Sequence, residues 1–284
     1  MTNIYAAPVC KLKNFSNLFI ELTAKNCNQR CKHCYIDFPI SKNIKDFIPI
    51  DTVKEALNDT NNEDLNCIYL TGAEPMTHPD FNTILRLCLN RTNVCICTNG
   101  TFINEKKARF LKHVEEESEF EIIFQLSIDH YNEIMSDDIR GRGSYRQVLH
   151  AIKSLVKYGF NPIICITDYY NEGKDILISE FKKIFQKIGF DAQNCNFKVN
   201  KWYDKNSNLS ENFTVSSGSL DCEYGRILTS KGIYTCPFLS NDHRGRSGSS
   251  FKDFSRKNSL ETNRCATCMN NHTALFSIDY EQFK

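Results

Sequence analysis

Three cysteines lie within eight residues near the start of the chain, at Cys27, Cys31 and Cys34, and an aromatic residue, Tyr35, follows the last of them. A structural zinc site normally takes four protein ligands and leaves no coordination position open. Three clustered thiols therefore predict a metal centre with one position left for chemistry. His33 provides an alternative, because a fourth ligand from this loop would complete a closed zinc site, and plain redox thiols are a further alternative.

Four more cysteines form a second group in the last quarter of the chain, at Cys222, Cys236, Cys265 and Cys268. Two separated pairs of thiols suit either a four-iron cluster or a structural zinc ion, and the spacing leaves both open. The other seven of the 14 cysteines are dispersed singly, at Cys10, Cys67, Cys88, Cys95, Cys97, Cys165 and Cys195. Most of these lie in apolar segments, where a free thiol usually acts as a small hydrophobic side chain.

The composition is that of an ordinary globular protein of 284 residues, with 41% hydrophobic residues and a net charge of +1. The 35 basic and 34 acidic side chains nearly balance, so the overall charge does not favour nucleic acid or an acidic membrane as a partner. No run of residues reaches membrane-spanning length, and the first residues lack a basic segment followed by an apolar core. We therefore expect a cytoplasmic protein without nucleic-acid or membrane partners, whose 14 cysteines indicate metal ligation rather than disulfides.

Short apolar segments alternate with helical patterns along most of the chain. The expected strands cover residues 18–22, 67–70, 94–97, 122–128, 162–167 and 196–199, and the expected helices cover residues 51–58, 79–88, 105–114, 145–158 and 175–188. Asp51 is the expected cap of the first helix. This alternation predicts an α/β fold of parallel β/α units, and six units do not fill an eight-unit barrel. A polar stretch at residues 204–211 marks the expected boundary between a domain of residues 1–203 and a smaller one of residues 204–284.

Polar and glycine-containing motifs follow the second, third and fourth expected strands, at Thr71–Pro75, Thr98–Gly100 and Ser127–Asp129. Active sites of α/β proteins lie at the carboxyl ends of parallel strands, where these motifs would meet. Alternation places Ser127 and Asp129 on one face of their strand. Arg140, in an expected loop at residues 138–144, can bind a carboxylate through two hydrogen bonds.

The spacing of the first cysteine group and these motifs, in this order, resemble the signature of the radical S-adenosylmethionine (SAM) superfamily. The resemblance implies a (β/α)6 partial barrel over roughly residues 16–200. It also implies that Cys27, Cys31 and Cys34 hold three irons of a 4Fe-4S cluster whose fourth iron binds SAM. The implied SAM contacts fall on Tyr35, Gly72, Ala73, Glu74, Asn99, Ser127, Asp129 and Arg140. Ala73 departs from the family motif, which has a second glycine there.

The second cysteine group resembles the Twitch domain, the shorter relative of the SPASM domain, in which four such cysteines bind an auxiliary 4Fe-4S cluster. One departure is Gly232, which lies one residue closer to Cys236 than the usual spacing. The resemblance implies that Cys222, Cys236, Cys265 and Cys268 are the ligands of this auxiliary cluster.

The superfamily resemblance implies an enzyme that reductively cleaves SAM to a 5′-deoxyadenosyl radical, which then abstracts hydrogen from a substrate. Relatives of this architecture modify ribosomally made peptides, mature sulfatases or dehydrogenate aminocyclitols. We therefore expect oxidative cross-linking or dehydrogenation of a ribosomally made peptide or protein side chain, with the auxiliary cluster as electron acceptor. The expected partners are a flavodoxin- or ferredoxin-like reductant and a separate peptide-recognition protein.

Two other functions remain as alternatives: dehydrogenation or epimerisation of a small molecule such as an amino sugar or aminocyclitol, and a metal-binding module without catalysis. An epimerase needs a hydrogen donor, for which Cys95, Cys97 and Cys165 are candidates. Asp129 is a candidate base for a dehydrogenation.

Overall fold

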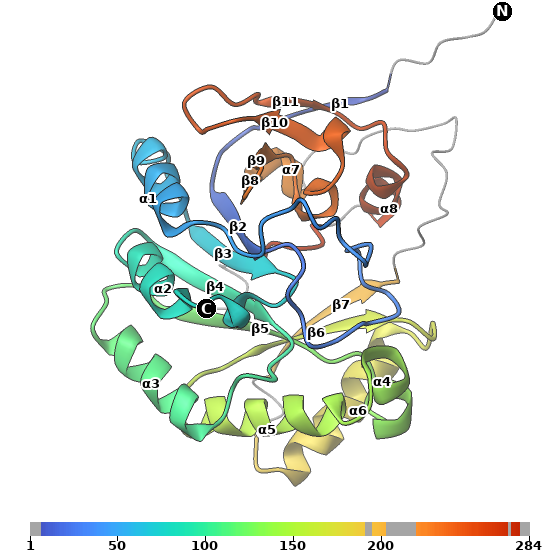
Figure 1. Cartoon of the computed structure of the whole chain (residues 1–284). Helices are drawn as coiled ribbons and strands as arrows, with labels where there is room; N and C mark the ends of the chain where they lie inside the picture. The colour runs from blue at the N-terminus through green and yellow to red at the C-terminus, as the bar shows by residue number, and fades with distance from the viewer. Residues whose placement is uncertain (1–6, 191–194, 203–219, 272–273, 279–284) are drawn as a thin grey trace, which may run out of the picture.

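The centre of the molecule is a nine-stranded sheet with the strand order β10-β9-β8-β2-β3-β4-β5-β6-β7 (Figure 1). The computed structural model describes residues 7–190, 195–202, 220–271 and 274–278. Six strands follow one another in chain order and pair in parallel. They are β2 (Asn17–Thr23), β3 (Cys67–Gly72), β4 (Asn93–Thr98), β5 (Ile122–Ser127), β6 (Ile163–Asp168) and β7 (Asn196–Lys201).

Helices connect these strands and cover the outer face of the sheet (Figure 1). They are α1 (Ile50–Asp59), α2 (Phe81–Leu89), α3 (Glu105–Glu116), α4 (Glu133–Arg140), α5 (Ser144–Lys157) and α6 (Lys174–Lys187). Strand alternation divides the apolar side chains between the two faces. Ile20 and Ile96 belong to the main core with the helices, whereas Phe19, Tyr69 and Cys95 belong to a second cluster on the inner face. The predicted α/β fold is confirmed.

Two local predictions are wrong. Asp51 does not cap α1, because the helix begins one residue earlier and Pro49 is the N-cap residue. Residues 138–140 are not in a loop but form the last turn of α4. This helix is only two turns long and starts at Asn132, whose side chain accepts hydrogen bonds from the amides of Ile134 and Met135. Its short apolar pattern gave little helical signal.

The C-terminal part continues the same sheet. After α7 (Asp221–Tyr224), strand β8 (Gly225–Thr229) pairs in parallel with β2, and β9 (Gly232–Tyr234) and β10 (Arg246–Gly248) extend the sheet in antiparallel pairings. Near the other end of the chain, β1 (Val9–Lys11) pairs with β11 (Lys257–Ser259), which precedes α8 (Asn263–Asn271). The expected boundary at residues 204–211 lies outside the described residues, so the division into two domains stays a prediction.

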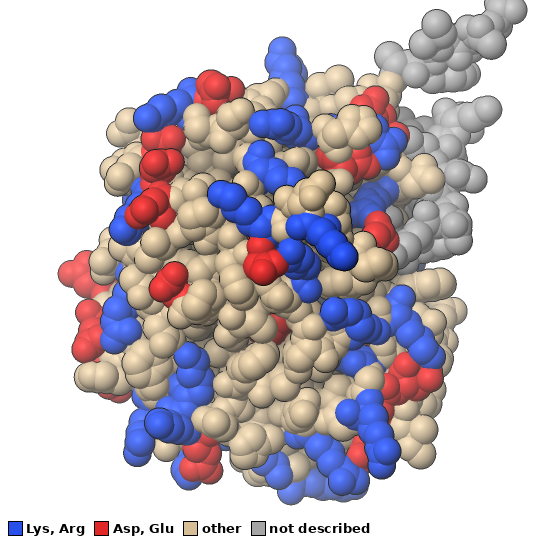
Figure 2. All heavy atoms as spheres, viewed as in Figure 1, with Lys and Arg blue, Asp and Glu red and all other residues tan. Residues whose placement is uncertain are grey.

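Charged side chains of both signs are scattered over the face of the molecule that Figure 2 shows. This distribution agrees with the net charge of +1. No helix within the described ranges is long and apolar enough to span a bilayer.

Candidate active site

A cavity of about 230 Å³ lies at the carboxyl ends of the parallel strands, and the three thiols of Cys27, Cys31 and Cys34 form part of its wall. This is the end of a parallel sheet at which α/β enzymes bind their ligands. The wall also contains seven of the residues that the motifs predict as SAM contacts: Tyr35, Gly72, Ala73, Glu74, Asn99, Ser127 and Arg140. Sequence segments far apart in the chain are therefore brought together as the motifs predict.

The cysteine loop is held from two sides. The amide of Gln29 donates a hydrogen bond to the sulfur of Cys27 over 3.3 Å, and Asn99 Nδ2 lies 3.8 Å from the same sulfur. On the other side, the amide of Lys32 donates to the carbonyl of Ile139 in α4 over 3.0 Å. These contacts fix the loop between the end of β4 and the last turn of α4.

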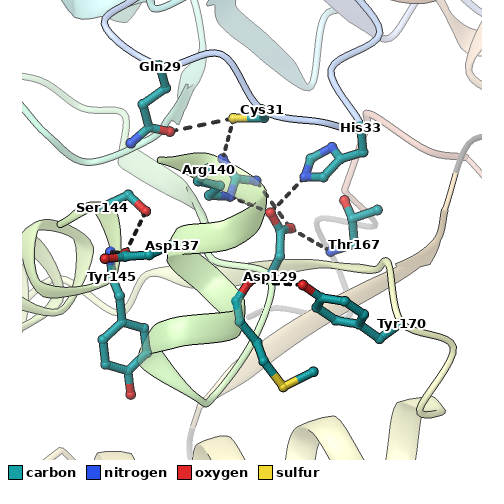
Figure 3. Close-up of polar contacts among 11 residues, drawn as sticks. Gln29, Cys31, His33, Asp129, Asp137, Arg140, Ser144, Tyr145, Thr167 and Tyr170 are labelled. Carbon is teal, nitrogen blue, oxygen red and sulfur yellow. Dashed lines mark hydrogen bonds and ion pairs between the residues drawn. The ribbon is translucent and has the colours of Figure 1, made fainter. Parts of the chain in front are cut away.

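A buried ion pair supports the middle of the loop (Figure 3). Asp129 is 1% exposed and accepts hydrogen bonds from Arg140 Nε at 2.5 Å, from Arg140 Nη2 at 3.2 Å and from the amide of Thr167 at 3.0 Å. Nε2 of His33 lies 2.7 Å from the same carboxylate. The remaining nitrogen of the guanidinium, Nη1 of Arg140, points to the sulfur of Cys31 at 3.7 Å.

This network fixes the positions of the charged groups beside the thiols. Burial opposes the ionisation of Asp129, but the charges of Arg140 and His33 outweigh it and hold the pKa of Asp129 well below its usual range. Because His33 faces this carboxylate, the geometry does not support a zinc site completed by its ring. Contacts of Asp129 and Arg140 with SAM stay predictions.

The turn after β3 joins two strand ends through one buried carboxylate. Glu74 accepts hydrogen bonds from Thr98 Oγ1 at 2.8 Å, from the amide of Asn99 at 2.9 Å and from the amide of Met76 at 3.1 Å. Burial raises the pKa of Glu74 to about 7. The carboxylate thus links the β3 turn to the end of β4.

The substitution of Ala73 for a glycine is accommodated. Among the described residues other than glycine, only Asn171 has a positive φ, so Ala73 avoids the left-handed region. The strained position is Gly72, whose φ is +134° and whose missing Cβ would lie 2.4 Å from the carbonyl oxygen of Thr23. A glycine is required at position 72.

Two of the three strand thiols face the cavity. Cys97 and Cys165 line its wall, and their sulfurs lie 3.9 Å and 3.6 Å from Oε1 of Gln125. Cys95 is fully buried in the apolar cluster of the inner face. Burial raises the pKa of Cys165 to about 12, so this side chain is a neutral thiol at neutral pH.

Residues 274–278, here called the closing segment, cross the inside of the molecule and complete the cavity wall. The carboxylate of Asp221 accepts hydrogen bonds from the amides of Leu275 at 2.7 Å, Phe276 at 3.0 Å and Ser277 at 2.8 Å. On its other side, the segment receives hydrogen bonds at its carbonyl groups from Gln125 at 3.2 Å, Lys198 at 2.5 Å and Asn200 at 3.5 Å. The segment is therefore bound along both edges of its backbone.

The second cysteine group lies directly behind this wall. Cys222 is on α7, Cys236 precedes a short 3-10 helix (Pro237–Leu239), and Cys265 and Cys268 are on α8. All four line a cavity of about 20 Å³. The aromatic rings of Phe238 and Phe276 border both this cavity and the larger one, with ring centroids 4.7 Å apart. These two aromatic side chains are thus shared by the walls of both cavities.

The donor sets fit the metal centres that the sequence predicts. Each group offers the thiols that iron–sulfur clusters use, three beside an open cavity and four around a small one. Among the described residues, no three metal-binding side chains converge closely enough to hold an ion as they stand. Binding at either group would therefore require the thiols to adjust.

Several residues of the site gave no sequence signal. From the sequence, His33 suggests only a metal ligand. No motif contains Gln125, Asp221 or Cys10. Their contacts join segments between 54 and 212 residues apart, from Asp221 and Leu275 at 54 to Cys10 and Cys222 at 212. Spacing along the chain cannot reveal such contacts.

The fold and the site together define an α/β protein with a group of three thiols at the carboxyl ends of a partial parallel barrel. The profile of the Radical SAM superfamily matches residues 22–187, more than half of the 284 residues. The chain belongs to the radical SAM superfamily. This membership implies a radical SAM enzyme with a SAM-binding 4Fe-4S cluster.

Solved structures agree with this assignment. Native anSMEcpe with bound AdoMet is similar over 92% of this chain and 84% of its own, with a TM-score of 0.65 and 16% identity. Streptococcus suis SuiB bound to precursor peptide SuiA is similar over 87% of this chain and 64% of its own, with a TM-score of 0.65 and 14% identity. At these identities the likeness shows the fold alone, which is the partial barrel of radical SAM enzymes. No curated protein matches the chain.

Proposed function

We propose that this radical SAM enzyme oxidises a peptide or protein side chain and that an auxiliary 4Fe-4S cluster at the second cysteine group accepts the electron. The observation that supports the proposal is the wall that the two cavities share, since Phe238 and Phe276 border both the large cavity and the small cavity of the second group of thiols. An electron left on the substrate would have a short path to that cluster.

Residues of the chain have distinct roles in this proposal. Cys27, Cys31 and Cys34 would hold the first cluster, which when reduced supplies the electron that cleaves SAM and so starts hydrogen abstraction. Arg140, fixed by Asp129, places a positive charge beside the thiols. The Thr71–Pro75 turn, Asn99 and Ser127 would position SAM at the strand ends.

A peptide substrate is favoured by the similar solved structures. SuiB was solved with the precursor peptide SuiA, and anSMEcpe was solved with a Kp18Cys peptide. The cavity wall is rich in apolar and aromatic side chains such as Tyr35, Phe238 and Phe276, which suit an apolar substrate side chain. A flavodoxin- or ferredoxin-like reductant, a separate peptide-recognition protein and a cytoplasmic location belong to this proposal.

The first experiment separates the two metal centres. A variant with Cys27, Cys31 and Cys34 all changed to Ala is reconstituted without oxygen, and its iron, sulfide and zinc are measured. About four irons per chain, as one cubane cluster requires, would agree with an auxiliary cluster. One zinc and no iron would make the C-terminal site structural and would contradict the oxidative mechanism. With the unmodified chain under reducing conditions, an absence of 5′-deoxyadenosine would favour a metal-binding module without catalysis.

A second candidate function is a redox-neutral epimerisation, because the thiols of Cys97 and Cys165 face the cavity and could return a hydrogen atom to the substrate. Thiol hydrogens exchange with water, so an epimerase would incorporate deuterium from D2O into its product. An oxidative reaction would not. Cys97→Ala and Cys165→Ala, with Cys95→Ala as the buried control, would then identify the donor.

A further inference from the structure

A fifth thiol lies at the second cysteine group. The sulfur of Cys10 is 3.3 Å from the sulfur of Cys222, and the two side chains are 4% and 7% exposed. Cys10 is held there by the backbone of β1, which pairs with β11 so that Cys10 is opposite Asn258. Cys10 does not line the small cavity that the other four thiols border, and its contact with the group is through Cys222.

A buried cation lies in the same place. Arg226 in β8 is 0% exposed, and its Nη1 donates hydrogen bonds to the carbonyls of Cys222 and Gly225, each over 2.7 Å. Among the described residues, Arg226 has no ion pair with a carboxylate, and its Nε has no hydrogen-bond partner. Its positive charge would stabilise thiolates at Cys222, Cys10 and Cys236.

A fully buried charge without a counter-charge is costly to a fold. The carbonyl contacts of Arg226 satisfy part of its hydrogen bonding but do not neutralise it. Four thiolates around one zinc ion, or around a four-iron cluster in its oxidised state, leave a net negative charge. Such a centre would supply the anion that Arg226 otherwise lacks.

We propose that Cys10 and Arg226 are positioning residues of a net negative metal–thiolate centre at Cys222, Cys236, Cys265 and Cys268. In the structure the thiol of Cys222 donates to the sulfur of Cys10. A metal-bound Cys222 is a thiolate and can only accept, so the hydrogen bond would reverse and Cys10 would donate its S–H to the sulfur of Cys222, while Arg226 would balance the charge of the centre. The inference rests on the proposed function only in requiring that a metal binds at these four cysteines. It applies equally to an iron–sulfur cluster and to a zinc ion.

The test uses the full chain with Cys27, Cys31 and Cys34 changed to Ala, so that only the second group binds metal. Metal retention against a competing chelator is measured for Cys10→Ala, Cys10→Ser, Arg226→Met and Arg226→Lys. Loss of an outer partner typically weakens metal binding by about 10–100-fold, which is the loss expected for Cys10→Ala and Arg226→Met. Cys10→Ser keeps a donor and Arg226→Lys keeps a charge, so each should lose less.

Matched controls remove similar groups elsewhere. Cys88→Ala deletes a fully buried thiol in the core under α2, and Arg91→Met deletes a guanidinium that donates to the carbonyls of Thr60, Asn61 and Glu63. Both should retain metal like the parent.

A second readout is the rise in Tm when metal is added, which should shrink in Arg226→Met and not in Arg91→Met. If the centre is an iron–sulfur cluster, Cys10→Ala and Arg226→Met should both shift its potential to more negative values.

The outcomes separate this inference from the proposed function. If the parent variant binds neither iron nor zinc, the C-terminal centre and this inference both fail. If the parent binds metal but the Cys10 and Arg226 variants retain it like the controls, the inference alone is overturned. Complete loss of metal in Cys10→Ala, equal to that in Cys222→Ala, would make Cys10 a ligand and would also overturn it. Should Arg226→Met not fold, Arg226→Lys and the two Cys10 variants decide the question.

Discussion

At the scale of single residues, the active site depends on one buried carboxylate. Glu74 follows β3 and accepts hydrogen bonds from Thr98 and Asn99 at the end of β4, so its side chain joins the turns after two neighbouring strands. Both oxygens of the carboxyl group face donors, whereas a glutamine would place an amide nitrogen, which cannot accept a hydrogen bond, in one of these two positions. The site therefore distinguishes glutamate from glutamine, although the two have nearly the same shape.

We predict that Glu74→Gln destabilises the fold by about 1–3 kcal/mol at pH 5, because both oxygens of the neutral carboxyl group can still accept whereas the amide nitrogen cannot, so one buried donor loses its acceptor. Burial raises the pKa of Glu74 to about 7. A raised carboxyl pKa means that the unfolded state loses its proton first, so the contribution of Glu74 to stability is complete below about pH 4.3 and declines as the pH rises to about 7. The difference between wild type and Glu74→Gln should thus shrink from pH 5 to pH 8 in denaturant titrations. A difference that grows over this range would contradict the raised pKa of Glu74.

Glu105→Gln is the control. Glu105 is in an exposed ion pair with Lys157, so this substitution should change the stability of the fold little.

We predict that Gly72→Ala damages the cysteine loop as well as stability. The added Cβ would lie 2.4 Å from the carbonyl oxygen of Thr23, at the end of β2 where the loop begins, and the backbone at position 72 has a positive φ. The expected results are a lower Tm and reduced iron bound by the first cysteine group. Gly159→Ala is the control, since Gly159 also has a positive φ but no atom within 4 Å of its missing Cβ. It should lose only about 1–2 kcal/mol and keep its iron. Equal iron loss in both variants would show that the contact with Thr23 is unimportant.

At the scale of elements, the closing segment connects the two cysteine groups. Asp221 binds the amides of Leu275, Phe276 and Ser277, and the next residue in α7 is Cys222. A movement of α7 on metal binding would therefore be transmitted to Phe276 in the cavity wall. The second cysteine group can thus affect the large cavity through structure, in addition to the electron transfer that we propose.

We predict that Asp221→Asn loosens the closing segment without unfolding the barrel. An amide in place of the carboxylate turns an N–H group toward backbone amides, which costs about 1–3 kcal/mol locally. Amide hydrogen exchange at residues 275–277 should accelerate by about tenfold or more, while exchange in β3 and β4 stays slow. Asp242→Asn is the control, because Asp242 accepts a hydrogen bond from the amide of Arg244 and does not contact the segment. Unchanged exchange at residues 275–277 would refute the role of Asp221.

At the scale of the whole molecule, the parallel β/α order could be predicted because it depends on local patterns. Apolar runs such as residues 67–70 and 94–97 specify strands, and the glycines at 159 and 189 end helices. The residues at the strand ends then meet because parallel strands share one edge. The cysteine loop, Glu74 and Asn99 therefore lie together at the strand ends, while their roles in binding a cluster or SAM stay predictions.

The rest of the site could not be predicted, because it depends on contacts between distant segments. The pairing of β1 with β11 brings Cys10 beside Cys222, and the closing segment reaches Gln125 over a separation of 151 residues. Neither contact has a periodic pattern or a local motif. Helix α4 was missed for a different reason, since a two-turn helix defined by a capping Asn132 has too few apolar positions to recognise.

The pairing of β8 with β2 has a consequence for attempts to divide this protein. Four residues of β2, from Asn17 to Ile20, pair in register with Gly225 to Leu228 of β8. A fragment of residues 1–203 would leave that row of backbone groups unpaired along an apolar strand, which is a template for pairing with other chains. Such a fragment should aggregate on expression, whereas the full chain stays monodisperse, and adding the missing residues as a separate polypeptide should rescue its solubility.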